Sequence, residues 1–86
     1  MKHIPRKRFG QHWLVDQGVL HRIVAAADLT AGDRILEVGP GRGALTERLL
    51  DSPAESVAAV ELDRDLVLGL QERFGPNPRF RNRGWW

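Results

Sequence analysis

The sequence contains no cysteine. Disulfide bonds and thiolate metal sites are therefore excluded, and the composition agrees with a reducing compartment. No uncharged stretch approaches the roughly 20 apolar residues that a membrane-spanning helix needs. The basic N-terminus is not followed by an apolar run of signal-peptide length. These absences predict a soluble, cytoplasmic protein without a metal or a membrane partner.

A length of 86 residues allows one small domain with a small core. The net charge is only +2, but the charges are unevenly placed, because basic residues crowd both ends and acidic residues lie between them. Basic ends on a near-neutral middle favour a surface for a polyanion such as nucleic acid. The basic residues are Lys2, Arg6, Lys7 and Arg8 near the start and Arg79, Arg81 and Arg83 near the end.

The spacing of apolar residues changes along the chain between the period of a helix and the short runs of buried strands. Helices are predicted after Asp16 as far as Ala27, over residues 44–50, and after Asp63 as far as Phe74, with both aspartates as helix caps. Buried strands are predicted over residues 34–38 and 57–60. This alternation implies an α/β fold with parallel strands joined by crossover helices.

The predicted domain occupies residues 16–75, between a basic arm of residues 1–15 and a divergent basic tail of residues 76–86. After Pro78 the pattern fails: a third strand could begin near Phe80, but residues 82–86 lack the character of a buried strand. Two parallel strands do not make a covered sheet. The sequence therefore predicts an incomplete α/β domain, in a chain cut or diverted in mid-domain.

The segment Glu37-Val-Gly-Pro-Gly-Arg-Gly43 lies between a predicted strand and a predicted helix. Glycines there allow positive φ and let the backbone approach a ligand without a Cβ in the way. The helix behind the loop offers N–H groups to an anionic ligand group. Glu61 ends the next strand, where an acid commonly accepts ribose hydroxyls. Gly39, Gly41 and Glu61 are therefore predicted cofactor-binding residues.

Spacing alone leaves the cofactor open. Gly39, Gly41 and Ala44 also satisfy the G-x-G-x-x-A dinucleotide fingerprint, so an NAD-binding fragment is one interpretation. Gly43 and the Glu37 carboxylate favour S-adenosylmethionine (SAM), because a carboxylate at the loop entrance repels a pyrophosphate and can orient the cationic amino-acid end of SAM. A third interpretation is a glycine turn that only permits close packing of strand and helix.

The N-terminal arm contains the run Arg6-Lys-Arg-Phe-Gly-Gln-His-Trp-Leu14. Cations beside an aromatic, glycine and amide cluster suit contact with nucleic acid, so Arg6, Lys7 and Arg8 are predicted RNA-binding residues. A flexible, solvated arm is the alternative interpretation of this composition.

Three segments together resemble the start of the ribosomal RNA adenine N6,N6-dimethyltransferases, a family that includes the bacterial 16S dimethylase and the Erm resistance methylases. The segments are Arg6-Lys-Arg-Phe-Gly-Gln-His-Trp-Leu-Val-Asp16, Leu36-Glu-Val-Gly-Pro-Gly-Arg-Gly-Ala-Leu-Thr46 and Val60-Glu-Leu-Asp-Arg-Asp65. The resemblance implies a Rossmann-like SAM-dependent methyltransferase fold and small-subunit ribosomal RNA as the partner. It also implies that His12, Leu14, Gly39 and Glu61 line the SAM pocket.

Family members continue with a Gly-Asp-Ala-like segment for the SAM adenine, an Asn-Leu-Pro-Tyr/Phe motif for the target adenine and a helical C-terminal domain, none of which occurs in this sequence. The adenine amine is a poor nucleophile because its lone pair is delocalised into the ring, so the flipped base must be held and oriented. No catalytic residue is therefore assigned, and the isolated chain is expected to transfer methyl groups negligibly. A non-catalytic RNA- or SAM-binding protein is the alternative function, and an out-of-frame reading after Gly75 would explain the lost pattern.

Overall fold

A computed structural model describes the backbone of residues 2–5 and the whole of residues 16–84. Helix α1 spans Gln17–Ala27, α2 spans Ala44–Leu50 and α3 spans Arg64–Phe74. Strand β1 spans Lys2–Pro5, β2 spans Arg34–Val38, β3 spans Ser56–Glu61 and β4 spans Phe80–Gly84. None of the described helices is long and apolar enough to cross a membrane.

The helix caps that the sequence predicts are present. The Asp16 carboxylate accepts two backbone N–H groups at the start of α1, at 2.8 and 3.1 Å. The Asp63 carboxylate accepts two at the start of α3, at 2.8 and 3.3 Å. Each aspartate satisfies N–H groups that have no partner inside the helix, so the roles of Asp16 and Asp63 as caps are confirmed.

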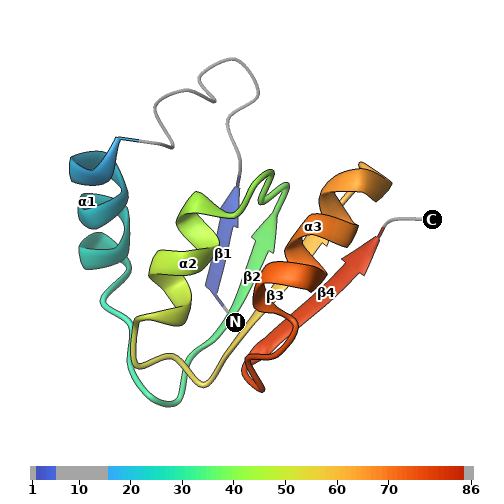
Figure 1. The fold of residues 1–86 in the computed structure, drawn as a ribbon. Helices are drawn as coiled ribbons and strands as arrows, with labels where there is room; N and C mark the ends of the chain where they lie inside the picture. Colours follow the sequence, from blue (N-terminus) through green and yellow to red (C-terminus); the bar gives the residue numbers. More distant parts are fainter. Residues whose placement is uncertain (1, 6–15, 85–86) are drawn as a thin grey trace.

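The strands form one parallel 4-stranded sheet in the order β1-β2-β3-β4. Helices α2 and α3 lie in front of this sheet in Figure 1, and α1 lies beside α2. The predicted α/β class with parallel strands is therefore confirmed. Because all strands run the same way, the ends of β2 and β3 and the segments that follow them lie at one edge of the sheet.

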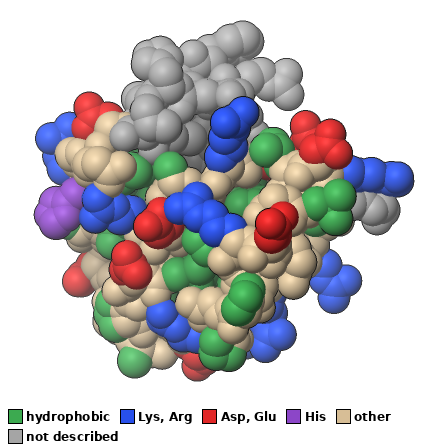
Figure 2. All heavy atoms as spheres, in the orientation of Figure 1, with side chains coloured by type: hydrophobic (Ala, Val, Ile, Leu, Met, Phe, Trp, Pro, Cys, Tyr) green, Lys and Arg blue, Asp and Glu red, His purple; other side chains and the backbone are tan. Residues whose placement is uncertain are grey.

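The core lies between the sheet and the helices. Alternate residues of β3, from Val57 to Glu61, are buried beneath the helices. At the end of β2, by contrast, the side chain of Val38 is 38% exposed. Figure 2 shows the helix-covered face, where basic, acidic and apolar side chains of the described residues are interspersed. The buried hydrophobic residues are Leu20, Ile35, Leu45, Leu49, Leu50, Ala54, Val57, Ala59, Leu70, Phe74 and Phe80.

Strand β4 corrects one expectation: residues 82–84 do form part of a strand. Its backbone pairs with β3 along the edge of the sheet, with Asn82 opposite Ala59. Phe80 is buried, whereas Arg81 and Arg83 are exposed. The Asn82 side chain donates a hydrogen bond to the backbone carbonyl of Val67 in α3, at 2.8 Å. An edge strand can therefore carry polar residues here, because its outer side chains meet water and its inner amide meets a helix carbonyl.

Strand β1 is a strand that the sequence analysis did not predict, and it lies within the residues predicted as a basic arm. It pairs in parallel with β2, with Ile4 opposite Glu37. The open edge of β2 presents backbone N–H and C=O groups that a neighbouring segment can satisfy. The described sheet therefore contains β1 and β4 in addition to the two strands predicted over residues 34–38 and 57–60. The division into an arm, a domain and a tail remains an expectation.

Arg79 closes the C-terminal end of α2. Its guanidinium donates hydrogen bonds to the backbone carbonyls of Leu50, of Ser52 at 3.0 Å and of Ala54 at 2.8 Å. The last carbonyls of a helix lack partners inside it, and a nearby cation is favoured by the helix dipole. Because Arg79 directly precedes β4, this contact also fastens the last strand to α2.

Replacing Arg79 by alanine is expected to lower the free energy of unfolding by about 2–3 kcal/mol, because the carbonyls lose a charged donor. Urea denaturation followed by circular dichroism measures this loss. Arg81→Ala is the matched control, since Arg81 is an exposed residue of the adjoining strand, and its change should stay below about 0.5 kcal/mol. Equal losses for both variants would contradict the capping role of Arg79.

Candidate functional site

The glycine loop connects β2 to α2 and occupies residues 39–43. Gly39, Gly41 and Gly43 have φ values of 68°, 61° and 89°. Residues with a side chain rarely adopt this left-handed region. The loop is closed by two backbone hydrogen bonds, from Gly39 N–H to the Val60 carbonyl at 2.8 Å and from Gly43 N–H to the Pro40 carbonyl at 3.0 Å. The positive φ angles expected of these glycines are therefore present, and the loop is hydrogen-bonded to the end of β3.

Glu61 joins the end of β3 to this loop. Its side chain is almost fully buried, and its Oε1 accepts the N–H of Gly41 at 3.0 Å. Its Oε2 accepts the N–H groups of Leu62 and Asp63, at 2.9 and 3.1 Å. The structure therefore brings together Gly39, Gly41 and Glu61, three of the residues predicted to bind the cofactor.

Glu37 lies beneath the loop rather than at its entrance. The side chain is 2% exposed, and its Oε1 accepts a hydrogen bond from the Thr46 hydroxyl of α2 at 2.5 Å. Glu37 lies opposite Ala59, and Glu61 follows two residues later in the same strand, so both carboxylates lie on the helix-covered face. The position that the sequence suggests for Glu37 is therefore corrected: residue 37 precedes the strand end by one residue, and alternation turns its side chain inward.

Burial raises the pKa of Glu37 from 4.5 to about 7. The hydrogen bond from Thr46 acts in the opposite direction and lowers the pKa, whereas the negative charge of Glu61 raises it further. A buried carboxylate loses the hydration that stabilises its charged form, and one hydroxyl donor does not replace it. Near neutral pH this site therefore holds a carboxyl group that gains or loses a proton readily.

Gly43 is required for packing as well as for backbone conformation. A Cβ at this position would lie 2.5 Å from Cε2 of Phe74 and 3.1 Å from Cδ2 of Leu70. Both side chains are buried residues of α3. The end of the glycine loop therefore lies directly against α3, and the loop geometry depends on how this helix packs.

A search with protein-family models matches residues 2–81 to the model described as ribosomal RNA adenine dimethylase. This match covers nearly the whole chain. The chain belongs to the ribosomal RNA adenine dimethylase family. The match begins at Lys2 and ends at Arg81, so it includes the whole of β1 and the first two residues of β4.

Curated relatives of the family agree. The chain is 75% identical over 81 residues to the ribosomal RNA small subunit methyltransferase A of Parasynechococcus marenigrum, an alignment that covers 94% of the chain and 27% of the relative. The corresponding protein of Synechococcus sp. strain WH7803 is 72% identical, with 94% and 29% covered. The chain therefore spans a little over a quarter of the length of these relatives.

Solved structures of methyltransferases share the fold. The 23S rRNA methyltransferase ErmE superposes with a TM-score of 0.71 at 34% identity, covering 78% of this chain and 27% of that one. A dimethyladenosine transferase from Plasmodium falciparum gives a TM-score of 0.70 at 28% identity, with 77% and 24% covered. A glycopeptide N-methyltransferase, MtfA, solved with SAM, shares only the fold, with a TM-score of 0.61 at 22% identity and coverage of 95% and 34%. The Rossmann-like methyltransferase fold is therefore confirmed.

The remaining residues predicted for the cofactor and RNA sites belong to the N-terminal segment. His12 and Leu14, predicted for SAM, and Arg6, Lys7 and Arg8, predicted for RNA, lie outside the described residues. Thr46 was not predicted from the sequence. The signal that could have found it is its place in the first turn of the helix that follows the loop, where a hydroxyl can reach a carboxylate at the end of the preceding strand.

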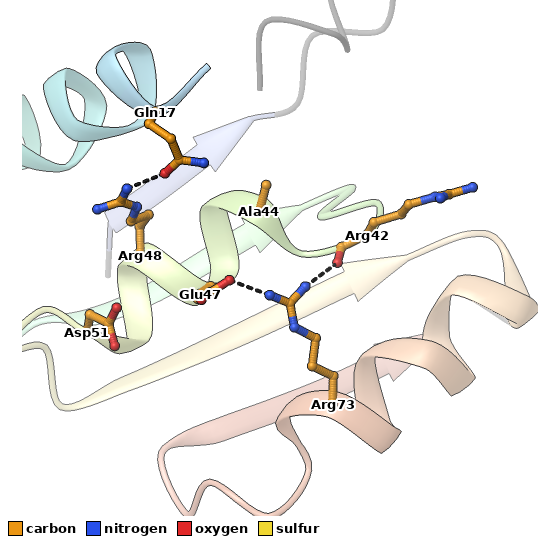
Figure 3. A pocket seen from close by; sticks show the side chains of 7 residues that line it. All are labelled: Gln17, Arg42, Ala44, Glu47, Arg48, Asp51 and Arg73. Carbon is orange, nitrogen blue, oxygen red and sulfur yellow. Dashed lines mark hydrogen bonds and ion pairs between the residues drawn. The ribbon is translucent and has the colours of Figure 1, made fainter. Parts of the chain in front are cut away.

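A surface hollow of about 260 Å³ lies on the outer side of α2 (Figure 3). Arg73 of α3 forms an ion pair with Glu47 and donates to the Arg42 carbonyl at 3.1 Å, while Arg48 donates to Gln17. These contacts tie α3 and α1 to α2 and leave acidic and basic groups mixed along the hollow. The candidate site is therefore the glycine loop with Glu61 and Glu37, and not this hollow. Its lining residues are Gln17, Arg42, Ala44, Glu47, Arg48, Asp51 and Arg73.

Gly43→Ala is expected to lower the free energy of unfolding by about 3 kcal/mol, through left-handed strain together with overlap with Phe74. Gly69→Ala is the control, because a Cβ there meets nothing within 4 Å inside α3. That variant should instead stabilise the fold by about 0.5–1 kcal/mol, as alanine does in a helix. Urea denaturation of both variants tests the pair, and a tolerated Gly43→Ala would refute the close packing described above.

The raised pKa of Glu37 predicts how stability changes with pH. The folded chain keeps this proton up to about pH 7, whereas the unfolded chain releases it near 4.5. Stability is therefore expected to fall as the pH rises from about 4.5 to about 7, by on the order of 3 kcal/mol from this group. Glu37→Gln cannot ionise and should lose this slope.

Urea denaturation at a series of pH values between 4.5 and 8 measures the slope. Glu72→Gln, at an exposed position of α3, is the control and should keep the native slope. The difference between the two variants isolates Glu37 from the other titrating groups. The same slope in Glu37→Gln and in the native chain would show that Glu37 ionises alike in the folded and unfolded states.

Proposed function

We propose that this chain supplies the SAM-binding part of a ribosomal RNA adenine N6,N6-dimethyltransferase, the activity of the family to which it belongs. The observation that carries the proposal is the bond between the Glu61 carboxylate and the Gly41 N–H. It places an acidic strand end against a glycine loop of positive φ, the arrangement that Rossmann-like folds use to hold a nucleoside. The small-subunit methyltransferases that resemble the chain support this assignment.

Electrostatics favours SAM over a dinucleotide. Glu37 and Glu61 are both buried on the helix-covered side of the loop, with 2% and 4% of their surfaces exposed. When they are ionised, two carboxylates in a poorly solvated region repel a diphosphate but stabilise a ligand that carries a positive charge and no phosphate. SAM, with its sulfonium and ammonium groups, is such a ligand. The NAD-binding interpretation is therefore not favoured, and neither the family nor the relatives support it.

The residues fit SAM in the following way. Glu61 would hold the ribose hydroxyls, and the backbone of Gly39 and Gly41 would lie close to the ligand because no Cβ intervenes. His12 and Leu14 would complete the pocket from the N-terminal arm. When bound, SAM supplies an electrophilic methyl group. The chain's own residues bind and orient the donor, and Glu61 keeps the loop in place through Gly41.

Small-subunit ribosomal RNA is the proposed substrate, and Arg6, Lys7 and Arg8 are the proposed contacts to its phosphates. The target adenine must be held out of its stack, a task that the family assigns to the Asn-Leu-Pro-Tyr/Phe motif. The contribution of this chain is therefore donor binding and phosphate contact rather than base orientation. A cytoplasmic location, where ribosomal RNA is available, accords with this role.

The test joins residues 1–81 of this chain to the remaining part of the Parasynechococcus marenigrum relative, in place of the matching segment. The hybrid is expected to methylate small-subunit ribosomal RNA with SAM as donor. Glu61→Gln in the hybrid should lower kcat/KM about ten- to a hundredfold, because a charge-assisted bond to the donor is lost. Tritium transfer from labelled SAM to the RNA measures the rate.

Glu72→Gln is the matched control in the hybrid and should leave the rate unchanged, since residue 72 is exposed on α3. The 86-residue chain alone should bind SAM in equilibrium dialysis and should not exchange it for NAD. A hybrid that folds and binds RNA but transfers no methyl group would contradict the proposed function. Displacement of SAM by NAD would restore the dinucleotide alternative.

A further inference from the structure

Thr46 connects the two ends of the glycine loop. It lies in the first turn of α2 with no exposed surface, and its hydroxyl donates to Glu37, which lies near the end of β2. A threonine inside a helix commonly returns its hydroxyl to a carbonyl of the preceding turn. Here the hydroxyl instead reaches from the helix to the strand. The strand before the loop and the helix after it are therefore joined by one buried hydrogen bond.

The two carboxyl groups on this face of the sheet accept hydrogen bonds from different donors. Glu61 accepts the N–H groups of Gly41, Leu62 and Asp63, whereas the described donor to Glu37 is the Thr46 hydroxyl. A buried carboxylate deprived of its donor must find another or take up a proton. The N–H of Gly41, bonded to the other carboxylate on the same face of the sheet, is a donor for which Glu37 would compete.

We propose that Thr46 is a positioning residue for the SAM site, an inference that rests on the proposed function. Its hydroxyl holds the Glu37 carboxyl group against α2, which leaves the Gly41 N–H to Glu61 and preserves the shape of the loop. Thr46 acts through Glu37 and through the loop, and it need not touch the ligand.

Ionisation of Glu37 should set the pH dependence of SAM binding, because a negative charge under the loop attracts a cationic ligand. Affinity is therefore expected to rise with pH through about 7, where burial has moved the pKa of Glu37. The Thr46 bond lowers that pKa, so its removal shifts the rise to higher pH. The negative charge of Glu61 in β3 acts on Glu37. The residue opposite Glu37 in β1 is Ile4, which carries no charge. Among the charged residues of α2 and α3, Glu47, Arg48 and Arg73 line the outer hollow, and Arg64, Asp65 and Glu72 are exposed residues of α3.

The experiment uses the 86-residue chain and the variants Thr46→Val and Thr46→Ser. Valine has the shape of threonine without the hydroxyl, and serine retains the hydroxyl. Amide resonances of Gly39, Gly41 and Gly43 report the loop without ligand, and calorimetry between pH 5.5 and 8.5 reports SAM affinity. Thr46→Val should displace these resonances, weaken SAM binding about tenfold at pH 7 and move the rise in affinity to higher pH. Thr46→Ser should restore all three properties.

The outcomes separate this inference from the proposed function. Unchanged loop resonances and unchanged SAM affinity in Thr46→Val would overturn the positioning role. Displaced resonances that serine restores, without SAM binding by any form, would support the positioning role and reject SAM as the ligand. If Thr46→Val does not fold, Glu37→Gln decides, because its amide oxygen still accepts from Thr46 but has no charge. That variant should keep the loop resonances and lose the pH dependence, and a native rise of affinity with pH would overturn the inference.

Discussion

The Glu61 carboxylate joins the loop that follows β2 to the segment that follows β3. One oxygen accepts the N–H of Gly41 from the loop that follows β2, and the other accepts the N–H groups of Leu62 and Asp63, which follow β3. Both segments leave the same edge of a parallel sheet, where backbone groups no longer have ladder partners. A single buried carboxylate therefore accepts backbone N–H groups from both segments. The loop shape, the start of α3 and the electrostatics of the candidate site all follow from its position.

The middle of the fold was predictable from residues because each local signal agreed with the next. Asp16 and Asp63 mark helix starts by their short acceptor side chains, and the apolar residues that follow give the helical period. The branched residues of residues 34–38 and 57–60 mark buried strands, and three glycines mark the loop between them. Gly41 and Glu61 were each predicted as cofactor-binding residues from their places along the chain, but the hydrogen bond between them was not predicted. Their contact depends on parallel pairing, which the alternation of elements already implies.

The remaining features depend on tertiary contacts that leave no periodic trace. Strand β4 has a polar sequence because Arg81 and Arg83 are exposed at the edge of the sheet. The Asn82 side chain donates a hydrogen bond to a backbone carbonyl of α3. Strand β1 is identified by its pairing with β2 and not by its own composition. The inward orientation of Glu37 is fixed by strand alternation, and its altered acidity by burial beneath helices that a single sequence does not position. The local sequence pattern predicts the order of helices and strands. The edge strands and the buried carboxyl groups can be identified only once the strands are paired and covered by helices.

The contact of Arg79 with the end of α2 has a consequence for how the chain comes together during synthesis. The carbonyls that it binds lie 25 to 29 residues earlier in the sequence. The helix that carries the end of the glycine loop is therefore made well before the cation that completes it. Until residue 79 has emerged from the ribosome, the carbonyls of Leu50, Ser52 and Ala54 must be satisfied by water. A nascent chain that ends before residue 79 lacks this cap, so the end of α2 gains its charged partner only after the strand that follows α3 has begun to be made.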